Sequence, residues 1–300
     1  MAEAATRAGF VALIGAPNAG KSTLLNRYVG TKISIVTHKV QTTRSRILGI
    51  AIHGASQIAF VDTPGIFEPR RRLERAMVQA AWEGVSGADL TVLLVDARRG
   101  LDEENQGIVD GLKESGRQAI LALNKIDVVK REKLLELAAR FDASGAFSDV
   151  FMISAANGDG AQDLLETLAD RVPEGPWLYP EDQLSDMPQR LLAAEVTREK
   201  LFLNVHEEVP YALTVETESW EAFRDGSVRI EQTVYVQKST QKAIILGKGG
   251  RMIRQIGEAA RLELEALLGT RVHLKLFVKV QERWAEDPAR YQTWNLDYKA

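Results

Sequence analysis

The sequence has no cysteine among its 300 residues, which excludes disulfides, thiolate metal sites and cysteine nucleophiles. It also lacks long hydrophobic runs, since no stretch approaches the ~20 apolar residues that span a bilayer. The opening MAEAATRAGF has no long apolar segment, so we expect no secretory signal. These absences favour a reducing, cytoplasmic setting, in which any membrane contact would be peripheral.

Positive charge is scarce overall but concentrated in one place. The net charge of −3 argues against a protein that binds nucleic acid through basic residues spread over its whole surface. Between Lys238 and Arg254, however, there are five basic residues and no acidic one, which leaves −8 for the rest of the chain. A compact basic spot on an acidic body predicts one anionic partner bound at one place.

The first 175 residues alternate strand-like and helical patterns, and several of the strand-like runs are almost entirely apolar. This order predicts a doubly wound α/β fold with a mainly parallel sheet. The runs at 46–52 and 57–61 are separated by only HGAS, which is too short for a crossover helix. We therefore expect an antiparallel hairpin at one edge of the sheet.

Four prolines between 173 and 188 interrupt this alternation, and the order of elements changes after them. From residue 189 onward the pattern predicts helix, two strands, two helices and a final strand, which is a smaller α+β unit. We predict a nucleotide-binding domain over 1–175, a linker over 176–188 and a second domain over 189–300.

The stretch from Gly15 to Ser22 matches G-x-x-x-x-G-K-[ST] and lies between the strand-like FVALI and a helical run. Its glycines let backbone N–H groups converge on phosphate, and the helix N-terminus adds partial positive charge. The lysine can neutralise the β- and γ-phosphates, and the serine hydroxyl can bind Mg²⁺. We predict nucleotide-binding residues at Gly15, Ala16, Pro17, Asn18, Ala19, Gly20, Lys21, Ser22 and Thr23.

Asp62-Thr63-Pro64-Gly65 follows the strand-like QIAFV, forty residues after the lysine–serine pair. An aspartate at a strand end beside the phosphate loop can hold hydrated Mg²⁺, and Gly65 leaves its N–H free for a γ-phosphate oxygen. Alone, DTPG is an ordinary turn, but in this position it predicts the second part of the site. We include the next residue, Ile66, in the predicted set.

Asn124-Lys125-Ile126-Asp127 follows AILAL, again at a strand end. A carboxylate accepts from guanine N1–H and N2–H₂ together, whereas adenine offers no such pair of donors, so Asp127 predicts guanine selectivity. Backbone N–H groups of Ser154, Ala155 and Ala156, after the last strand, can meet guanine O6. The alternative is a P-loop ATPase in which NKID caps a helix by coincidence.

These motifs together resemble a Ras-like P-loop GTPase domain, and the P-loop NTPase fold is what the resemblance implies. Gln41-Thr42-Thr43-Arg44 resembles the switch threonine motif of that family, with Thr43 favoured over Thr42 as a metal ligand. The implied cofactor is Mg²⁺, held by Ser22, Thr43 and Asp62. Ile66 stands where related GTPases carry a water-orienting glutamine, so we assign no catalytic residue and expect slow intrinsic turnover.

Gly247-Lys248-Gly249-Gly250 lies between two helical segments inside the basic window. A GxxG turn lets a nucleic-acid backbone approach closely, and this turn with its element order resembles a prokaryotic-type KH domain. The plain alternative is a helical hairpin whose glycines only cap a helix. The predicted RNA-binding residues are Gly247, Lys248, Gly249, Gly250, Arg251, Lys242 and Arg254.

A GTPase domain joined to a prokaryotic-type KH domain is similar to the layout of the Era family over essentially the whole chain. That resemblance implies binding of GTP and GDP, of the single-stranded 3′ end of small-subunit ribosomal RNA, and a role in assembly of the small ribosomal subunit. It also implies peripheral contact with the inner membrane, and we expect a monomer. The alternative function is a membrane-surface signalling GTPase whose second domain binds protein or lipid.

Overall fold

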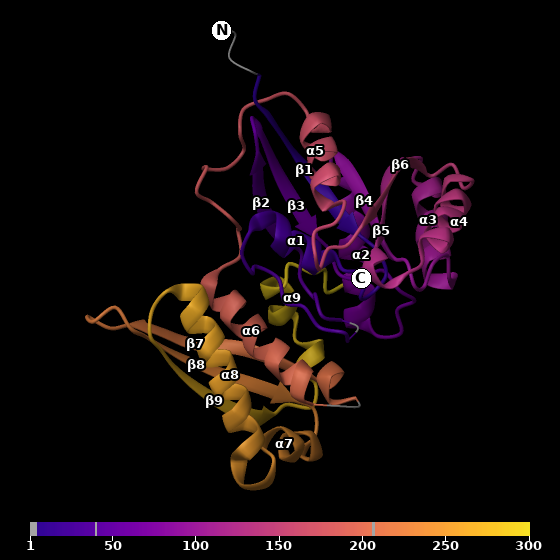
Figure 1. Ribbon diagram of the computed structural model, residues 1–300. Coiled ribbons are helices and arrows are strands. Elements are labelled where there is room, and N and C mark those ends of the chain that lie inside the picture. The colour runs from indigo at the N-terminus through magenta and orange to yellow at the C-terminus, as the bar shows by residue number, and fades with distance from the viewer. Residues whose placement is uncertain (1–4, 40, 206–207) are drawn as a thin grey trace. The chain divides into compact units, whose positions relative to one another are not determined.

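The computed structural model describes residues 5–39, 41–205 and 208–300, and its contacts divide the chain into two compact units (Figure 1). Unit 1 contains Met1–Ser34, Val40–Asp186 and Tyr291–Ala300, and unit 2 contains Ile35–Lys39 and Met187–Arg290. Each unit therefore includes a short segment whose sequence neighbours belong to the other. The predicted domain division at 175 and 189 stays a prediction.

Unit 1 is built on a six-stranded sheet in the order β2-β3-β1-β4-β5-β6. All neighbouring strands are parallel except β2 and β3, which form the expected antiparallel edge hairpin. This confirms the predicted doubly wound, mainly parallel α/β fold. The strands are β1 (Arg7–Ile14), β2 (Ile47–His53), β3 (Ser56–Asp62), β4 (Leu90–Asp96), β5 (Ala119–Asn124) and β6 (Phe147–Ile153).

Five helices pack on this sheet because alternate strand residues point to opposite faces. Alternate residues of β1, β4 and β5, such as Ile14, Leu93 and Leu121, share one core cluster with α2, α3 and α4, while α1 and α5 contact β2 and β3. The helices are α1 (Lys21–Val29), α2 (Arg72–Ser86), α3 (Glu103–Glu114), α4 (Arg131–Asp142) and α5 (Ala161–Arg171).

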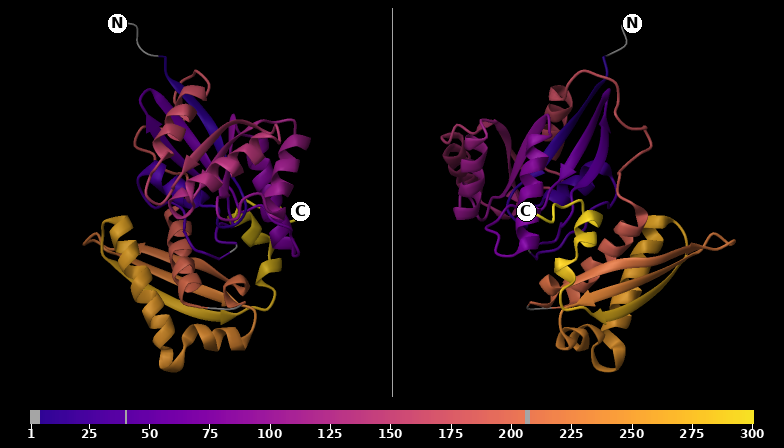
Figure 2. Two further views of the ribbon diagram at one scale, coloured as in Figure 1. Left: turned by 45° about the vertical axis from the view of Figure 1, so that its right-hand side comes forward. Right: turned by 180° about the vertical axis from the view of Figure 1, so that it is seen from behind.

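Unit 2 has a three-stranded sheet in the order β7-β8-β9, with β7–β8 antiparallel and β8–β9 parallel. A parallel pair needs a crossover, and α7 and α8 supply it. Helices α6 and α8 pack against each other and against this sheet (Figures 1 and 2). The elements are α6 (Gln189–Asn204), β7 (Leu213–Ala222), β8 (Val228–Val236), α7 (Ser239–Leu246), α8 (Arg251–Leu268) and β9 (Val272–Val280).

The C-terminal residues form structure that the sequence patterns do not predict. A 3-10 turn at Trp284–Glu286 and α9 (Pro288–Thr293) follow β9, and the indole of Trp284 is fully buried, with its N–H donating to Ala212 O at 3.0 Å. Within unit 1, the Arg72 guanidinium lies 4.6 Å from the centroid of the Tyr298 ring. Across the described residues, no helix is long and apolar enough to cross a membrane.

Candidate nucleotide site and nucleic-acid interface

The four motifs of the predicted nucleotide site follow the carboxyl ends of β1, β3, β5 and β6. These strands run in one direction in one sheet, so their carboxyl ends lie along the same edge, which is where open α/β sheets bind ligands. Gly15 directly follows β1, Asp62 and Asn124 end β3 and β5, and Ser154 follows β6. The fold therefore brings together residues that are up to 139 positions apart in the sequence.

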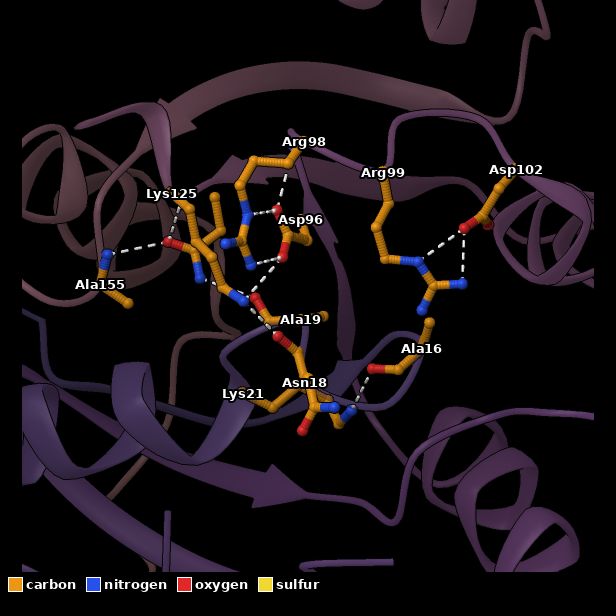
Figure 3. Close-up of polar contacts among 11 residues, drawn as sticks. Ala16, Asn18, Ala19, Lys21, Asp96, Arg98, Arg99, Asp102, Lys125 and Ala155 are labelled. Carbon is orange, nitrogen blue, oxygen red and sulfur yellow. Dashed lines mark hydrogen bonds and ion pairs between the residues drawn. The ribbon is translucent and has the colours of Figure 1, made fainter. Parts of the chain in front are cut away.

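The phosphate loop needs its glycines for close approach. A Cβ on Gly15, at φ +148°, would lie 2.3 Å from Leu94 O, and one on Gly20, at φ +105°, would lie 2.1 Å from Asn124 Nδ2. The Lys21 ammonium donates to Gly15 O at 2.9 Å and to Ala16 O at 3.1 Å, and Figure 3 shows the contact with Ala16. Burial lowers the Lys21 pKa to about 8, against the opposing effect of Asp62.

The predicted metal-binding residues form one connected cluster. Ser22 Oγ donates to Asp62 Oδ2 at 2.8 Å, and the Thr43 and Ser22 hydroxyls are 3.1 Å apart. Asp62 is fully buried, burial raises its pKa, and its Oδ1 has no hydrogen-bond partner among the described residues. A buried carboxylate oxygen with neighbouring hydroxyls suits Mg²⁺, which prefers oxygen ligands and retained waters. The hydroxyl at this cluster belongs to Thr43, which supports Thr43 rather than Thr42 as the metal ligand.

Ser34 joins the same cluster and was not among the predicted residues. Its hydroxyl donates to Asp62 Oδ2 at 2.9 Å, and the side chain is buried. Asn26 Oδ1 accepts from the backbone N–H groups of Ile33 (2.9 Å) and Ser34 (3.0 Å), which fixes this turn. No local motif marks Ser34, because its role depends on a carboxylate 28 residues further along the chain.

Asn124 braces the base side of the site. Its buried amide donates to Ala19 O at 2.7 Å and accepts from Ala155 N at 2.9 Å, so it joins the phosphate loop to the loop after β6. The Ser154 hydroxyl donates to Asp127 Oδ1 at 2.6 Å and so orients the carboxylate predicted to select guanine. The Ala155 N–H, which was predicted to meet guanine O6, is therefore hydrogen-bonded to Asn124 within the protein.

Lys125 has a left-handed backbone conformation, at φ +67°, and its side chain makes contacts that the motif alone did not predict. Its ammonium donates to Asn18 O at 2.6 Å and to Asp96 Oδ2 at 2.7 Å (Figure 3). Burial alone would raise the Asp96 pKa, but hydrogen bonds from Arg98 and Lys125 outweigh it and lower the pKa to about 2. Asp96 ends β4 at the same sheet edge, which is the signal that could have identified it.

The segment after β3 lies against the phosphate loop. Thr63 Oγ1 donates to Leu13 O at 2.9 Å, and Ile66 N donates to Gly15 O at 3.1 Å. A Cβ on Gly65 would lie 2.9 Å from Pro17 Cγ, so only glycine allows this approach. The Ile66 side chain is buried in the unit 1 core and offers no polar group to a water molecule.

The GKGG turn in unit 2 joins α7 to α8 in backbone conformations that favour glycine. Gly247, Gly249 and Gly250 have φ values of +68°, +62° and +74°, and a Cβ on Gly247 would lie 2.7 Å from Met252 Cβ. Of the predicted RNA-binding side chains, those of Lys248, Arg251 and Arg254 are exposed, while Lys242 is partly buried.

Beside this turn, a cavity of about 450 Å³ is lined by side chains of α8 and β9, including Ile253, Leu274 and Leu276. Arg254, Gly257, Glu258 and Arg261 also line it, so it combines apolar side chains with two basic residues and one acidic residue. Ile245 and Ile256 are fully buried in the unit 2 core, and the cavity residues Ile253 and Leu276 pack against that core.

Comparison with known proteins gives two family matches. The family described as "50S ribosome-binding GTPase" matches residues 10–125, and "KH domain" matches residues 208–285. A protein named GTPase Era from Rhizobium meliloti (strain 1021) is 59% identical over 293 residues, covering 98% of this chain and 94% of that protein. GTPase Era from Brucella suis biovar 1 is 56% identical over the same shares of both chains.

Two solved structures are similar over nearly the full length. The crystal structure of a point variant of Aquifex aeolicus Era bound to GDP and AlF4⁻ has a TM-score of 0.91 and 36% identity, and covers 96% of this chain and 99% of that one. Era in complex with MgGDPNP and nucleotides 1506–1542 of 16S ribosomal RNA has the same TM-score and identity, with 96% and 98% covered.

The carboxylate of Asp127 generates a prediction about base selectivity. Asp127→Asn removes an acceptor for two guanine donors, so GTP affinity should fall by about 100-fold or more and xanthosine triphosphate should be preferred. Isothermal titration calorimetry with GTP, xanthosine triphosphate and ATP measures this. Asp159→Asn, on the loop after β6, is the matched control and should bind GTP normally. Competition by ATP with GTP at equal concentration would contradict a guanine site.

The lowered pKa of Lys21 generates a prediction about proton uptake. At pH 8, which is close to the Lys21 pKa of about 8, a large fraction of the free protein has a neutral Lys21 side chain. Bound triphosphate should favour the protonated side chain and so restore its charge. GTP binding should then take up a fraction of a proton, which disappears at pH 6.5. Calorimetry in two buffers of different ionisation enthalpy measures the uptake. Lys21→Arg stays charged and should abolish it, whereas uptake that persists in this variant would assign it elsewhere.

Proposed function

Because the chain belongs to the Era family of GTPases, we propose that it hydrolyses GTP while bound to the 3′ end of small-subunit ribosomal RNA and so assists assembly of the small ribosomal subunit. The observation that carries this proposal is the presence, in one chain, of a guanine-type nucleotide site and an exposed GKGG turn with basic neighbours. The Era structure that contains 16S ribosomal RNA supports the choice of RNA.

In the nucleotide site, each residue acts through a charge or a hydrogen bond. The Lys21 ammonium neutralises the β- and γ-phosphates, and Asp127 selects guanine. Ser22, Thr43 and Asp62 would hold Mg²⁺, which when bound offsets phosphate charge. Ile66 cannot orient the attacking water, so the chain's own residues bind and position GTP better than they activate water. Slow intrinsic turnover follows from this difference.

In unit 2, the GKGG turn would receive the RNA backbone and the adjacent cavity would receive unstacked bases. The turn's glycines leave room for phosphate, and the N-terminus of α8 adds partial positive charge. The apolar walls of the cavity and Arg254 suit the faces and edges of single-stranded bases. The acid-free window around the turn accounts for a basic spot on an otherwise acidic protein.

We further propose that nucleotide state and RNA affinity are coupled through residues 35–39, which belong to unit 2 although residues 41–44 belong to unit 1. Val36 N donates to the buried carboxylate of Glu199 at 2.8 Å, and the Lys39 ammonium donates to Phe202 O and Val205 O at the C-terminal end of α6. Nucleotide-dependent ordering of the Thr43 region can therefore change the stability of contacts made within unit 2.

From Glu199 the contacts continue toward α8. Lys200 pairs with Glu199 at 3.1 Å and with Glu263, which lies on the helix that begins directly after the GKGG turn. Thermodynamic reciprocity then requires that RNA change nucleotide affinity by the same factor as nucleotide changes RNA affinity.

We infer that the protein acts in the cytoplasm as a monomer, and peripheral contact with the inner membrane stays a prediction.

The decisive test of the proposed function is sedimentation with purified ribosomal subunits in the presence of a non-hydrolysable GTP analogue. We expect binding to the small subunit and to an oligonucleotide of the 16S 3′ end. Binding only to the large subunit would instead agree with the description of the matching GTPase family. Binding to neither particle, together with binding to anionic vesicles, would favour the membrane-surface alternative.

The GKGG turn generates a prediction about RNA. Gly249→Asp places a negative charge at a residue with φ +62° and open space around it, and should weaken oligonucleotide binding at least tenfold while GTP affinity is unchanged. Fluorescence anisotropy measures both. Gly226→Asp, at φ +84° in the β7–β8 turn and equally open, controls for backbone strain. Equal losses in both variants would show that strain, not phosphate contact, is responsible.

The Val36–Glu199 hydrogen bond generates a prediction about coupling. Glu199→Ala removes a charged acceptor worth about 1.5–3 kcal/mol, so the ratio of RNA affinities with GTP analogue and with GDP should move toward one by about tenfold or more. Glu231→Ala, which removes an ion pair with Lys275 outside this set of contacts, should leave the ratio unchanged. A wild-type ratio of one would leave the coupling without support.

A further inference from the structure

A cavity of about 660 Å³ in unit 1 borders the predicted nucleotide site through Pro17, Gln41 and Ile66, but most of its lining residues have no role in that site or in the RNA interface. It lies among the phosphate loop, the segments that follow Gly65, and the helices α2 and α3. Its volume falls within the range of ordinary ligand pockets. One wall is apolar and includes Ile66, Phe67, Val78 and Trp82, of which Val78 and Trp82 also pack on the core.

Four glutamates and one arginine line the same cavity, so the formal charge of its lining is −3. Glu74 is engaged internally, since it accepts from the backbone N–H groups of Arg70 and Arg71, and Glu104 pairs with Arg99 at 2.7 Å. The side chains of Glu68 and Glu103 are exposed and make no hydrogen bond or ion pair with the described part of the chain. Two carboxylates therefore remain available at the rim of an apolar pocket.

This combination selects the chemistry of the occupant. Lysine and arginine carry an apolar stem and a cationic head, which match the apolar wall and the rim carboxylates respectively. The Trp82 ring offers an additional surface for a cation. RNA phosphate is disfavoured, because it would place negative charge beside Glu68 and Glu103.

The cavity also touches the segments that are predicted to contact nucleotide. Pro17 belongs to the phosphate loop, and the Gln41 side chain donates to Glu74 Oε1 at 2.8 Å, which joins the switch segment to the first turn of α2. A ligand in this cavity would thus contact residues whose arrangement depends on the bound nucleotide.

We propose that this cavity binds a lysine- or arginine-bearing segment of a protein of the small ribosomal subunit. The inference rests on the proposed function, since that particle combines RNA with proteins whose basic residues neutralise it. In this proposal the GKGG turn binds the RNA of the small subunit, and the unit 1 cavity binds one of the subunit's proteins. The chain would then recognise both components of the particle, each at a separate place.

Charge reversal at the cavity tests the proposal and tells whether the occupant is a cation or an anion. The double variant Glu68→Lys and Glu103→Lys should lower affinity for purified small subunits by at least tenfold, measured by sedimentation with a GTP analogue. Binding of GTP and of the 16S oligonucleotide should stay within twofold of wild type. Glu132→Lys is the control, because Glu132 is likewise an exposed acid in the first turn of a helix, α4, but lies outside the cavity.

The outcomes separate the two hypotheses. If the double variant binds subunits as well as the wild type does, the cavity proposal is overturned while the proposed function stands. If it binds more tightly, the occupant is RNA phosphate and the proposal is equally overturned. If the wild-type protein does not bind small subunits, the proposed function fails and the cavity proposal fails with it.

A crosslink identifies the occupant directly. Gly107 lines the cavity, a Cβ there would meet nothing within 4 Å, and the chain has no other cysteine, so Gly107→Cys accepts a single photoreactive maleimide. With small subunits, we expect attachment to a protein peptide that contains lysine or arginine, and its loss when Glu68→Lys and Glu103→Lys are added. Attachment to 16S ribosomal RNA would overturn the proposal.

Discussion

The buried amide of Asn124 holds together loops from three different strands, and the nucleotide site depends on it. It binds Ala19 of the phosphate loop, Ala155 after β6, and the backbone of Lys125 beside it. A buried amide must satisfy its hydrogen bonds inside the protein, so these loops can adopt only the arrangement that satisfies them. Gly20 is glycine for the same reason, because a Cβ would occupy the position of the Asn124 side chain.

Around this brace, the fold keeps two opposite charges out of water. Lys21 and Asp62 are both buried, and burial shifts their pKa values toward the neutral forms. Each shift disfavours a charge that a phosphate or a divalent cation would stabilise, so the ligand supplies what the protein lacks. Asp96 shows the contrasting case, because Arg98 and Lys125 already compensate its charge. The site therefore combines buried charges at the phosphate end, which their neighbours compensate only in part, with a well-compensated carboxylate, Asp96, at the base end.

The two units do not simply follow one another along the chain, because each contains a short segment from the other's part of the sequence. Residues 35–39 belong to unit 2 and residues 291–300 to unit 1, although in each case the neighbouring sequence belongs to the other unit. The first segment lies just before the predicted switch threonines, so in the proposed coupling a change there would reach unit 2 through the Val36–Glu199 hydrogen bond. The basis for a nucleotide-dependent response thus lies in chain connectivity as well as in the site.

Sequence alone determined the elements up to β9, the edge hairpin and the motifs at the strand ends, because periodicity, proline and glycine act over a few residues and are visible locally. The family resemblance and the guanine-type site follow from those motifs. Only the tertiary structure brought the Thr43 hydroxyl, already favoured from the sequence, to the Ser22 hydroxyl, added Ser34 and Asp96 to the site, and placed the C-terminal residues in unit 1. These contacts join residues far apart in the chain, and strand register and packing decide them, which no local pattern records.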